Sequence, residues 1–497
     1  MSQVTRRTAA RSSISASSIL VWLGLALLAL VGAWHLLAAW EEGSSGGRDF
    51  VQDYAAIVKI GQGRDPYEPY NDVTQELFGG PPHRGPLYSF HAPSSLPLMI
   101  WLLPIAKLDG YRDAFLAWGF VSVLSLWAVC WLTLRALAVP KPEPAGLLMA
   151  LTLVSLPAIR QSFEEGQLNV VVAAGMVGCW AARRSGRSGL AGVLLGAAFS
   201  LKPIPGLFFL YYAWRRDWRL VGAAVATVFA LSVVGVALSG VHGAWLWATV
   251  NYPSHADVWP GYPDNGSVRG FFTRIFGPSE WRPRPRFPVP YVAAVLWAAS
   301  GALLTLAALR AAGFDVRQAL RSDDARAHRG RRTPSLLDRL TVPLAPDDPR
   351  GDLEIAALTV LTLLVTPIVW PHYYVVLVMP VTVLAVDLGR LILDGSILAS
   401  ATPTAEAPLN SEPVAPDIAN VASSPAYDRR RRVLPTVGLI VLGLTSIVLG
   451  TAHYVEPFAG VGGQQLTALL ALYATSLVAL AWSVRGQGRG SSPAPSR

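Results

Sequence analysis

The sequence predicts an all-α fold, a polytopic transmembrane helical bundle of about 11–12 helices. Hydrophobic residues make up 52% of the 497 residues and charged residues only 15%, whereas soluble domains carry about 25% charged residues. The charged residues gather in short segments between long apolar stretches, and roughly 20 apolar residues are enough to cross the hydrocarbon core. These observations leave little room for a large soluble domain.

The first predicted span runs from residue 19 to Trp40. It follows a basic N-terminus with Arg6 and Arg7, and it is too long for the apolar core of a typical signal peptide. We therefore expect an uncleaved first helix, with residues 1–18 in the cytoplasm. Further apolar segments follow at 94–106, 113–138, 145–159, 168–182, 189–213, 219–239, 288–311, 353–369, 373–390, 434–453 and 464–484.

Arginine-rich segments predict the orientation, because cytoplasmic loops of membrane proteins are enriched in Lys and Arg. Segments 312–352 and 391–433 are expected in the cytoplasm, and the long loops 41–92 and 240–287 outside. The middle of the chain leaves a choice open. The basic clusters at 183–187 and 215–219 can share the cytoplasmic side only if the segment between them turns back at Lys202-Pro203.

These predictions divide the chain into a main transmembrane module over 19–390 and C-terminal transmembrane helices over 434–484. The linker 391–433 contains a stretch rich in Ala, Pro, Ser and Glu, which cannot bury enough apolar surface to fold alone. The tail 485–497 has a similar composition, so we expect both to be disordered.

The net charge of +9 is explained by topology and does not indicate a nucleic-acid partner. Cys130 and Cys179 both lie in apolar segments and have neither metal-ligand spacing nor a disulfide pattern. The sequence has no Walker loop, dinucleotide-binding glycine turn or zinc motif. We therefore expect no cofactor, no metal and no cytoplasmic nucleotide chemistry.

An acidic pair follows the first span. Asp49 and Asp53 are four residues apart, so a helix presents both on one face. A carboxylate at this position suits a general base. Asp is also a favoured N-cap, and the near-helical spacing of apolar residues over 50–60 predicts a short surface helix. The spacing alone allows either role for Asp49.

Two further clusters place amides and a cation beside apolar segments. Gln167 and Asn169 open such a segment, and their amides suit sugar hydroxyls as well as a helix cap or a neighbouring helix. Lys202 is the only charge in a long apolar stretch. It either holds a phosphate or extends its ammonium to the membrane interface.

The last two clusters are predicted at the outer boundary. Asn265 and Arg274 lie in the external loop, where the planar fork of Arg suits a phosphate, although an ordinary polar loop has the same composition. Trp370 fits an aromatic belt. The adjacent His372 does not, and it pairs with a carboxylate or phosphate unless it is a satisfied boundary histidine.

In this order the clusters resemble glycosyltransferase family 87, within the GT-C superfamily of membrane enzymes. The matching motifs are Asp49-Phe50 with Tyr54, Gly63-Arg64-Asp65-Pro66-Tyr67, Gly166-Gln167 with Asn169, Lys202-Pro203, Asn265 with Ser267 and Arg274, and Pro367 with Trp370 and His372. Two positions depart from the family pattern. Asp53 replaces the first Tyr of a pair, and His372-Tyr373 replaces a His pair.

The resemblance implies a polyprenyl-phosphate sugar donor, often polyprenyl-phosphate mannose, and inverting transfer to a glycolipid or glycan acceptor. It also implies a site on the outer face of the bacterial cytoplasmic membrane. The implied base is Asp49, with Asp53 as a second candidate. The residues implied to bind the donor phosphate are Lys202, Arg274 and His372. Those implied to bind sugar or acceptor are Tyr54, Gln167, Asn169, Asn265 and Trp370.

Three alternatives remain at the level of the sequence. Nothing in these residues separates mannose from arabinofuranose. A transporter or lipid flippase also explains many helices and a lone lysine, but it would usually show inverted repeats, and none is found. An inactive sugar- or lipid-binding scaffold is the third alternative.

Overall fold

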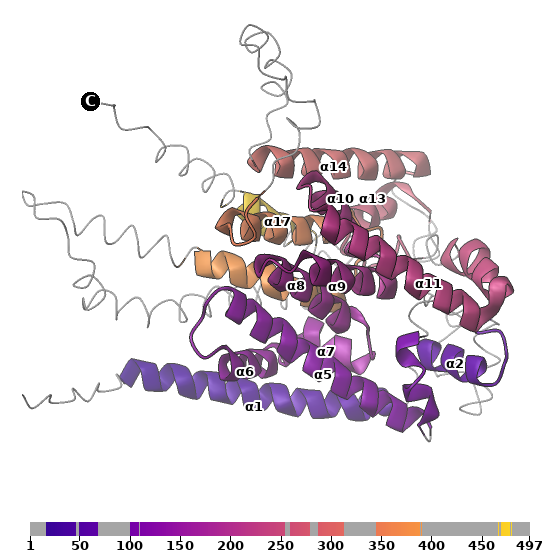
Figure 1. Ribbon diagram of the computed structural model, residues 1–497, viewed down its shortest axis with the longest axis horizontal. Helices are drawn as coiled ribbons and strands as arrows, with labels where there is room; N and C mark the ends of the chain where they lie inside the picture. Colours follow the sequence, from indigo (N-terminus) through magenta and orange to yellow (C-terminus); the bar gives the residue numbers. More distant parts are fainter. Residues whose placement is uncertain are drawn as a thin grey trace, which may run out of the picture.

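In the computed structural model, all regular elements of the described residues are helices, which confirms the all-α prediction (Figure 1). The structure describes residues 16–45, 49–67, 100–108, 110–253, 259–278, 287–312, 344–387, 389, 466, 469–477 and 479. The predicted span 434–453, the linker and the C-terminal tail lie outside these residues.

The helices occur in the following order: α1 Ala16–Ser44, α2 Phe50–Gly61, η2 Ile105–Lys107, α5 Tyr111–Ala136, α6 Pro142–Val154, α7 Pro157–Glu164, α8 Asn169–Arg184, α9 Ser188–Leu201, α10 Gly206–Trp214, α11 Trp218–Leu246, η3 Trp247–Asn251, α13 Val268–Phe276, α14 Pro290–Ala311, α17 Pro349–Val365 and η5 Pro371–Leu377.

Four described helices are long and apolar enough to cross a membrane: Trp22–Ser44, Tyr111–Ala136, Trp218–Asn251 and Pro290–Ala311. A bent pair, α6 with α7, makes a fifth candidate with an angle of 87° between its halves. The predicted span 145–159 is therefore not straight. Its break falls at Leu156-Pro157, because the residue before a proline is disfavoured in helical geometry.

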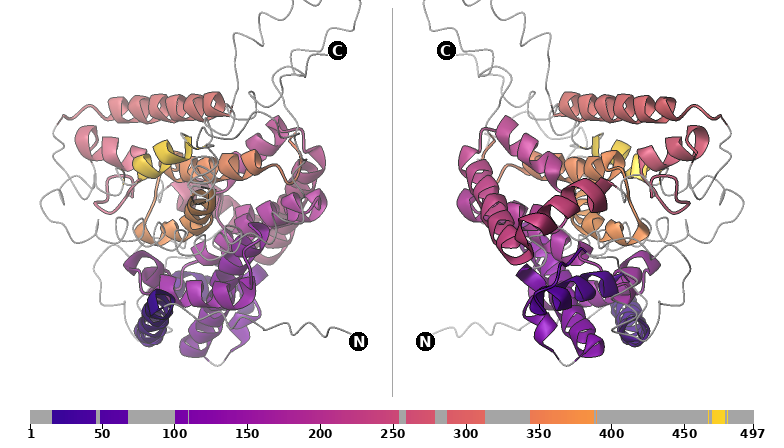
Figure 2. Two further views of the ribbon diagram at one scale, coloured as in Figure 1. Left: turned by 90° about the vertical axis from the view of Figure 1, so that its left-hand side faces the viewer. Right: turned by 90° about the vertical axis from the view of Figure 1, so that its right-hand side faces the viewer.

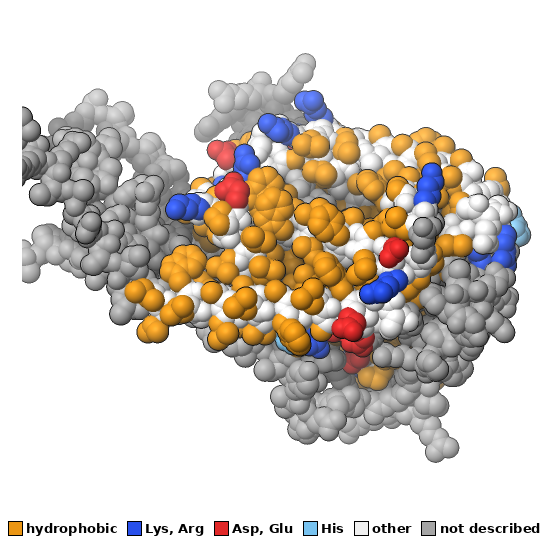
Figure 3. Space-filling model, turned by 90° about the horizontal axis from the view of Figure 1, so that it is seen from below, with side chains coloured by type: hydrophobic (Ala, Val, Ile, Leu, Met, Phe, Trp, Pro, Cys, Tyr) orange, Lys and Arg blue, Asp and Glu red, His pale blue; other side chains and the backbone are white. Residues whose placement is uncertain are grey.

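The outer helices present apolar side chains to their surroundings. α1 and α14 lie at opposite edges of the bundle (Figures 1 and 2), and only 22% and 6% of their most apolar windows are buried. Seen from the α1 side, hydrophobic side chains cover the middle of the face and charges gather toward its ends (Figure 3). This distribution fits a surface in contact with lipid, where a charge is costly.

The predicted segment 189–213 is two helices, because the chain turns back between Leu201 and Gly206. α9 packs against α8 and α11 near the centre of the bundle (Figure 1). α10 has nine residues, about 14 Å of helix, which is too short to cross a membrane. Since α9 and α10 form this hairpin, the basic clusters at 183–187 and 215–219 come to the same end of the bundle, which resolves the choice that the sequence left open.

Glycines let α9 approach α11 closely. A Cβ on Gly192 would overlap the carbonyl oxygen of Leu220, and one on Gly196 would lie 2.5 Å from that of Ala224. Small residues at helix contacts are the usual means of close packing in membranes. This contact fixes the hairpin against the long helix beside it.

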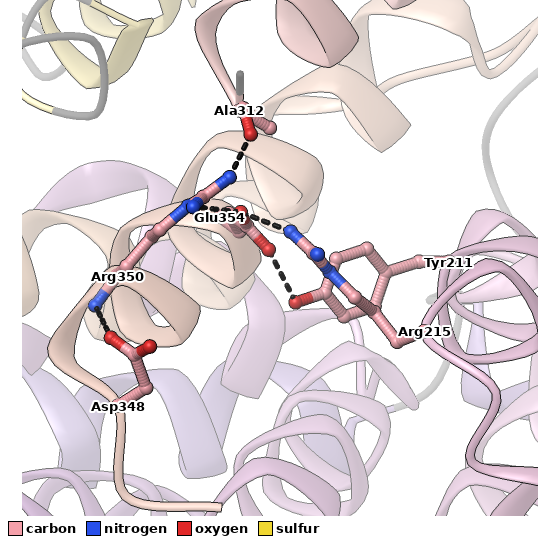
Figure 4. A network of polar contacts seen from close by, with 6 residues as sticks. All are labelled: Tyr211, Arg215, Ala312, Asp348, Arg350 and Glu354. Carbon is pink, nitrogen blue, oxygen red and sulfur yellow. Dashed lines mark hydrogen bonds and ion pairs between the residues drawn. The ribbon is translucent and has the colours of Figure 1, made fainter. Parts of the chain in front are cut away.

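A buried ion-pair network joins the end of α10 to the start of α17 (Figure 4). Glu354 accepts from Arg215 through one carboxylate oxygen and from Tyr211 through the other, the latter at 2.9 Å. Arg350 donates to the same carboxylate at 3.1 Å and also to the carbonyl of Ala312. The Arg215 and Glu354 side chains are only 2% and 3% exposed, so removing one partner would leave a buried charge.

Two more ion pairs extend this layer along the ends of α8 and α11. Arg183 pairs with Asp217 at 2.5 Å, and Arg184 pairs with Asp352, which also accepts from Trp180 Nε1 at 2.9 Å. We name this layer the polar belt, which consists of Arg183, Arg184, Arg215, Asp217, Asp352 and Glu354. In this layer, Arg183, Arg184 and Arg215 of the two basic clusters each form an ion pair with an acidic residue.

The described C-terminal residues pack into the bundle beside α14. Leu469 and Ser476 are fully buried, and Tyr473 donates to the carbonyl of Leu304 at 2.5 Å. α17 ends at Val365, four residues before the predicted end at 369, since Pro367 follows and disfavours helical geometry at Thr366.

Substituting Gly192 by Ala should destabilise the α9–α11 contact, because the added methyl group overlaps the main chain of α11. Overpacking of this kind typically costs about 1–3 kcal/mol. The measurement is the thermal unfolding midpoint of the purified protein in one detergent. The matched control is Gly222→Ala on α11, where a Cβ meets nothing within 4 Å. Equal midpoints for the two variants would contradict the close packing.

Candidate functional site

The acidic pair lies at the start of α2, which packs against α5 and η2. Phe50, Val51 and Tyr54 are buried on the inner face of this helix, so α2 packs one face onto the core. Asp49 occupies the N-cap position, but its side chain makes no capping hydrogen bond. The carboxylate of Asp49 points elsewhere, which removes the capping explanation for it.

The turn before α8 comes up to this carboxylate. Its Gly166 has φ +63°, and a Cβ there would lie 2.6 Å from that of Phe50. The carbonyl of Gly166 accepts from Trp118 Nε1 at 2.9 Å, and the carbonyl of Glu165 accepts from the Phe50 amide at 3.0 Å. Glycine is needed for both the left-handed backbone and the close approach. The turn is therefore held against α2 at a fixed distance.

A chain of hydrogen bonds connects the carboxylate to a buried ammonium group. Gln167 donates through Nε2 to Asp49 Oδ2, and its Oε1 accepts from Lys202 Nζ at 2.9 Å. Asn169 Oδ1 accepts from the same ammonium at 2.9 Å. The break between α9 and α10 thus brings Lys202 to the N-terminal end of α8. The carboxylate and the cation share one amide as their neighbour.

Aromatic side chains of η5 cover the ammonium. Lys202 Nζ lies 4.5 Å from the centre of the Tyr373 ring, a cation–π contact. His372 is buried close enough to be influenced by the charge of Lys202. Its ring lies 6.4 Å from that of Trp370 and nearly parallel to it. Four residues from two segments of the chain, 167–169 and 372–373, therefore lie around one cation.

Buried polar atoms around Lys202 remain without partners. Within the described residues, Asn169 Nδ2 and both ring nitrogens of His372 have no hydrogen-bond partner, although these residues are 0% and 4% exposed. The ammonium fixes the amide orientation of Asn169, because it can only donate and so faces Oδ1. An unsatisfied buried donor is costly. The site therefore suits a ligand that supplies oxygen acceptors at this point.

Asn265 holds the loop before α13 to the segment that follows α17. Its Nδ2 donates to the carbonyl of Pro367 at 3.1 Å, and its Oδ1 accepts from the Val369 amide at 2.9 Å. Arg274 is 2% exposed and donates to the carbonyls of Tyr262 and Asn265 at 2.8 and 2.9 Å. The contacts described for both side chains end on main-chain atoms. Their sugar- and phosphate-binding roles stay predictions.

The other predicted sugar-binding aromatics lie in two separate groups. Trp370 packs edge-on against Tyr262, with ring centres 4.8 Å apart, and its ring also lies next to that of His372. Tyr54 is 5% exposed and packs 5.5 Å from Tyr111, in the aromatic cluster around Phe50. Trp370 therefore lies beside the Lys202 cluster, whereas Tyr54 supports α2 from within the core.

Asp53 lies on the same helix as Asp49, outside the candidate spans. Loss of hydration on burial raises the pKa of Asp53 from 3.8 to about 7; the charge of Lys202 lowers it, and that of Asp49 raises it. The two carboxylates and one ammonium are thus electrostatically coupled. Near neutral pH, the Asp53 carboxyl is therefore partly protonated.

The site brings together most of the residues that the sequence singled out. Asp49, Gln167, Asn169 and Lys202 are joined by hydrogen bonds, and the two residues Asp53 and His372 lie within their electrostatic reach. We name the following residues the Lys202 cluster: Asp49, Asp53, Gln167, Asn169, Lys202, His372 and Tyr373. The sequence analysis did not assign a role to Tyr373, although its position next to His372 was a signal.

Fold and site together define a helical membrane protein with a buried cluster of carboxylates, amides and one ammonium. Residues 95–326 match the model for glycosyltransferase family 87. The predicted resemblance to this family is confirmed over that range, which includes Gln167, Asn169, Lys202, Asn265 and Arg274. Asp49 and His372 lie outside it.

Two curated relatives come from Mycolicibacterium smegmatis. A polyprenol-phosphate-mannose-dependent alpha-(1-2)-phosphatidylinositol mannoside mannosyltransferase is 28% identical over 231 residues, 46% of this chain and 44% of the relative. A polyprenol-phosphate-mannose-dependent alpha-(1-2)-phosphatidylinositol pentamannoside mannosyltransferase is 24% identical over 188 residues, 36% of this chain and 45% of the relative. The chain thus spans less than half the length of these relatives.

Among solved structures, the chain is similar to ArnT from Cupriavidus metallidurans bound to undecaprenyl phosphate. The identity is 13%, the likeness covers 96% of this chain and 79% of that chain, and the TM-score is 0.37. The apo state of the same protein gives a TM-score of 0.34. We draw no conclusion about the site from TM-scores at this level.

Substituting Asp53 by Asn should make the protein more stable than the wild type at pH 8 but not at pH 4. A raised pKa means that the native state holds the Asp53 proton more tightly than the unfolded chain does. Its contribution to stability is present in full below pH 3.8 and is lost as pH rises through about 7. The measurement is the thermal unfolding midpoint of both proteins across this range.

The matched control for this measurement is Asp113→Asn, which removes an exposed carboxylate at the start of α5. Its difference from the wild type should not grow between pH 4 and pH 8. A constant difference for the Asp53 variant would contradict the raised pKa.

Proposed function

We propose that the protein is a membrane glycosyltransferase of GT-C type. It transfers a sugar, in the first instance mannose, from a polyprenyl-phosphate donor to a glycolipid or glycan acceptor. The family match over residues 95–326 supports the reaction class. The names of both relatives, which specify polyprenol-phosphate-mannose and phosphatidylinositol mannosides, support the donor and suggest acceptors to assay.

The observation that carries the proposal is the Lys202 cluster. It holds a buried cation beside unsatisfied donors, with a carboxylate one amide away. A phosphate ester supplies negative charge to Lys202 and oxygen acceptors to the buried donors of Asn169 and His372. The carboxylate of Asp49 supplies the base that a hydroxyl acceptor needs.

In the proposed reaction, the acceptor hydroxyl attacks the anomeric carbon from the face opposite the phosphate. The new bond forms between acceptor oxygen and carbon while the bond from carbon to phosphate oxygen breaks, so the configuration inverts. Asp49 takes the hydroxyl proton. The electron pair of the broken bond leaves with the polyprenyl phosphate, and Lys202 stabilises the charge that develops on it.

The other residues support this step. His372 and Asn169 donate to the phosphate or to sugar hydroxyls, and Trp370 offers an aromatic face to the sugar. Asp53 shares protons with the site near neutral pH. The contacts of Arg274 and Asn265 with main-chain carbonyls favour a positioning role, in which they hold the external loop against residues 366–370.

The proposal includes a site that faces the outside of the cytoplasmic membrane. The polar belt carries the basic clusters at one end of α8 and α9, and the Lys202 cluster lies at the other. α8 has 16 residues and α9 has 14, about 21–24 Å of helix, against a hydrocarbon core of about 30 Å. Basic residues favour the cytoplasmic side, which supports the opposite side for the site.

Replacing Asp49 by Asn should lower the transfer rate by about 10²–10⁴-fold, because the amide cannot accept the proton. The measurement is transfer of radiolabelled mannose from polyprenyl-phosphate mannose to phosphatidylinositol mannosides by the purified protein in lipid nanodiscs. A parallel arm with polyprenyl-phosphate arabinofuranose separates the two sugars. Binding of undecaprenyl phosphate by the variant should persist.

The matched control for the Asp49 variant is Glu41→Gln, which changes an exposed acid near the end of α1 and should leave the rate within about twofold. Full activity of the Asp49 variant would exclude Asp49 as the base. Donor binding by the wild type without transfer to any acceptor would indicate a scaffold.

Single cysteines should report the two sides of the membrane. The native Cys130 and Cys179 are buried, so the background of labelling is low. A Gln62→Cys variant at the exposed end of α2 should react with a membrane-impermeant maleimide on intact cells, and a Ser185→Cys variant should react only after permeabilisation. The reverse pattern would place the site in the cytoplasm.

A further inference from the structure

The side chain of Gln167 lies between two opposite charges that would otherwise attract each other. Its Nε2 donates to Asp49 Oδ2 and its Oε1 accepts from Lys202 Nζ at 2.9 Å. The orientation of the amide is determined by its neighbours, because an ammonium only donates and a carboxylate only accepts. One uncharged group therefore satisfies both ions and keeps them from direct contact.

Hydrogen bonds fix the main chain around Gln167, and so fix the position from which its side chain reaches both charges. Its amide donates to the carbonyl of Ser162 at 2.8 Å, and the two preceding carbonyls are bound by Phe50 and Trp118. Gly166 is packed against Phe50. The turn therefore presents the Gln167 side chain from a fixed position between α2 and the hairpin of α9 and α10.

Direct pairing of the two charges would disable both in the proposed reaction. A lysine in contact with a carboxylate stabilises its ionised form and makes it a weaker base. The same contact neutralises the cation that a phosphate requires, and in a buried site this attraction is strong. Two polar groups with opposite tasks must therefore be close but separate.

We propose that Gln167 is a positioning residue that holds Asp49 and Lys202 apart, so that the first stays available to the acceptor and the second to the donor phosphate. This inference rests on the proposed function and gives Gln167 a task different from the sugar contact expected from the sequence. In this proposal, the side-chain amide of Gln167 sets the distance between the base Asp49 and the cation Lys202.

The test is a double-mutant cycle read by binding of undecaprenyl phosphate to the protein in nanodiscs. Gln167→Leu should weaken binding about tenfold, because Lys202 then pairs with Asp49. In the Asp49→Asn background no carboxylate is present at that position. There the added Gln167→Leu change should alter binding by less than about twofold, since the pairing is impossible.

Two further variants separate this role from a structural one. Gln161→Leu on α7 makes the same chemical change six residues earlier and should leave binding within about twofold. Gln167→Met, which is unbranched and adaptable in shape, repeats the cycle if the leucine variant unfolds. The unfolding midpoint of each variant is measured alongside.

The pH profile of transfer gives a second readout. Gln167→Leu should move the acidic limb of the rate to lower pH, since contact with Lys202 keeps Asp49 ionised. A side chain that only supported the fold would lower the rate at all pH values alike. Among the described residues, the groups electrostatically coupled to this carboxylate include Asp53, Lys202, Tyr262 and Tyr373.

The outcomes distinguish this inference from the proposed function. Binding by the wild type together with an equal loss in both backgrounds, or with no loss at all, overturns the role of Gln167 alone. Absence of binding by the wild type overturns the proposed function, and the inference with it. Weaker binding that Asp49→Asn rescues supports both.

Discussion

The site is organised by one constraint, which is the need to stabilise the buried ammonium of Lys202. A charge removed from water needs fixed partners, and here they are two amide oxygens and an aromatic face. The two amide oxygens come from the start of α8 and the residue just before it, and the ring comes from η5, so these two segments must converge where α9 ends. The arrangement of these helices therefore follows from the solvation of one side chain.

The second polar layer complements the first. The polar belt joins α8, α11 and α17 through paired charges, and the Lys202 cluster joins the opposite ends of α8 and α9 to η5. Because an ion pair or a hydrogen-bonded ion tolerates little displacement, each layer fixes the helices at one level. Apolar packing, such as that at Gly192, fills the space between them.

The sequence predicted well whatever depends on local chemistry. Pro203 and the two basic clusters indicated that segment 189–213 turns back if both clusters share one side. Gln167 and Asn169 were predicted to open an apolar segment, and α8 begins at Asn169. The contact of Gln167 with Asp49, 118 residues away, could not be predicted from the sequence, because this contact depends on how α2 packs on α5. The main-chain partners of Arg274 were equally hidden, because a guanidinium pattern in a loop does not reveal whether it faces a ligand or a carbonyl.

The burial of Leu469, Tyr473 and Ser476 beside α14 bears on how the chain matures. Leu469, Tyr473 and Ser476 thus cover part of a helix that lies more than 150 residues earlier in the sequence. During synthesis, α14 is therefore made well before the residues that cover this flank. A chain that ended before Leu469 would leave the Leu304 carbonyl without the Tyr473 hydroxyl that binds it.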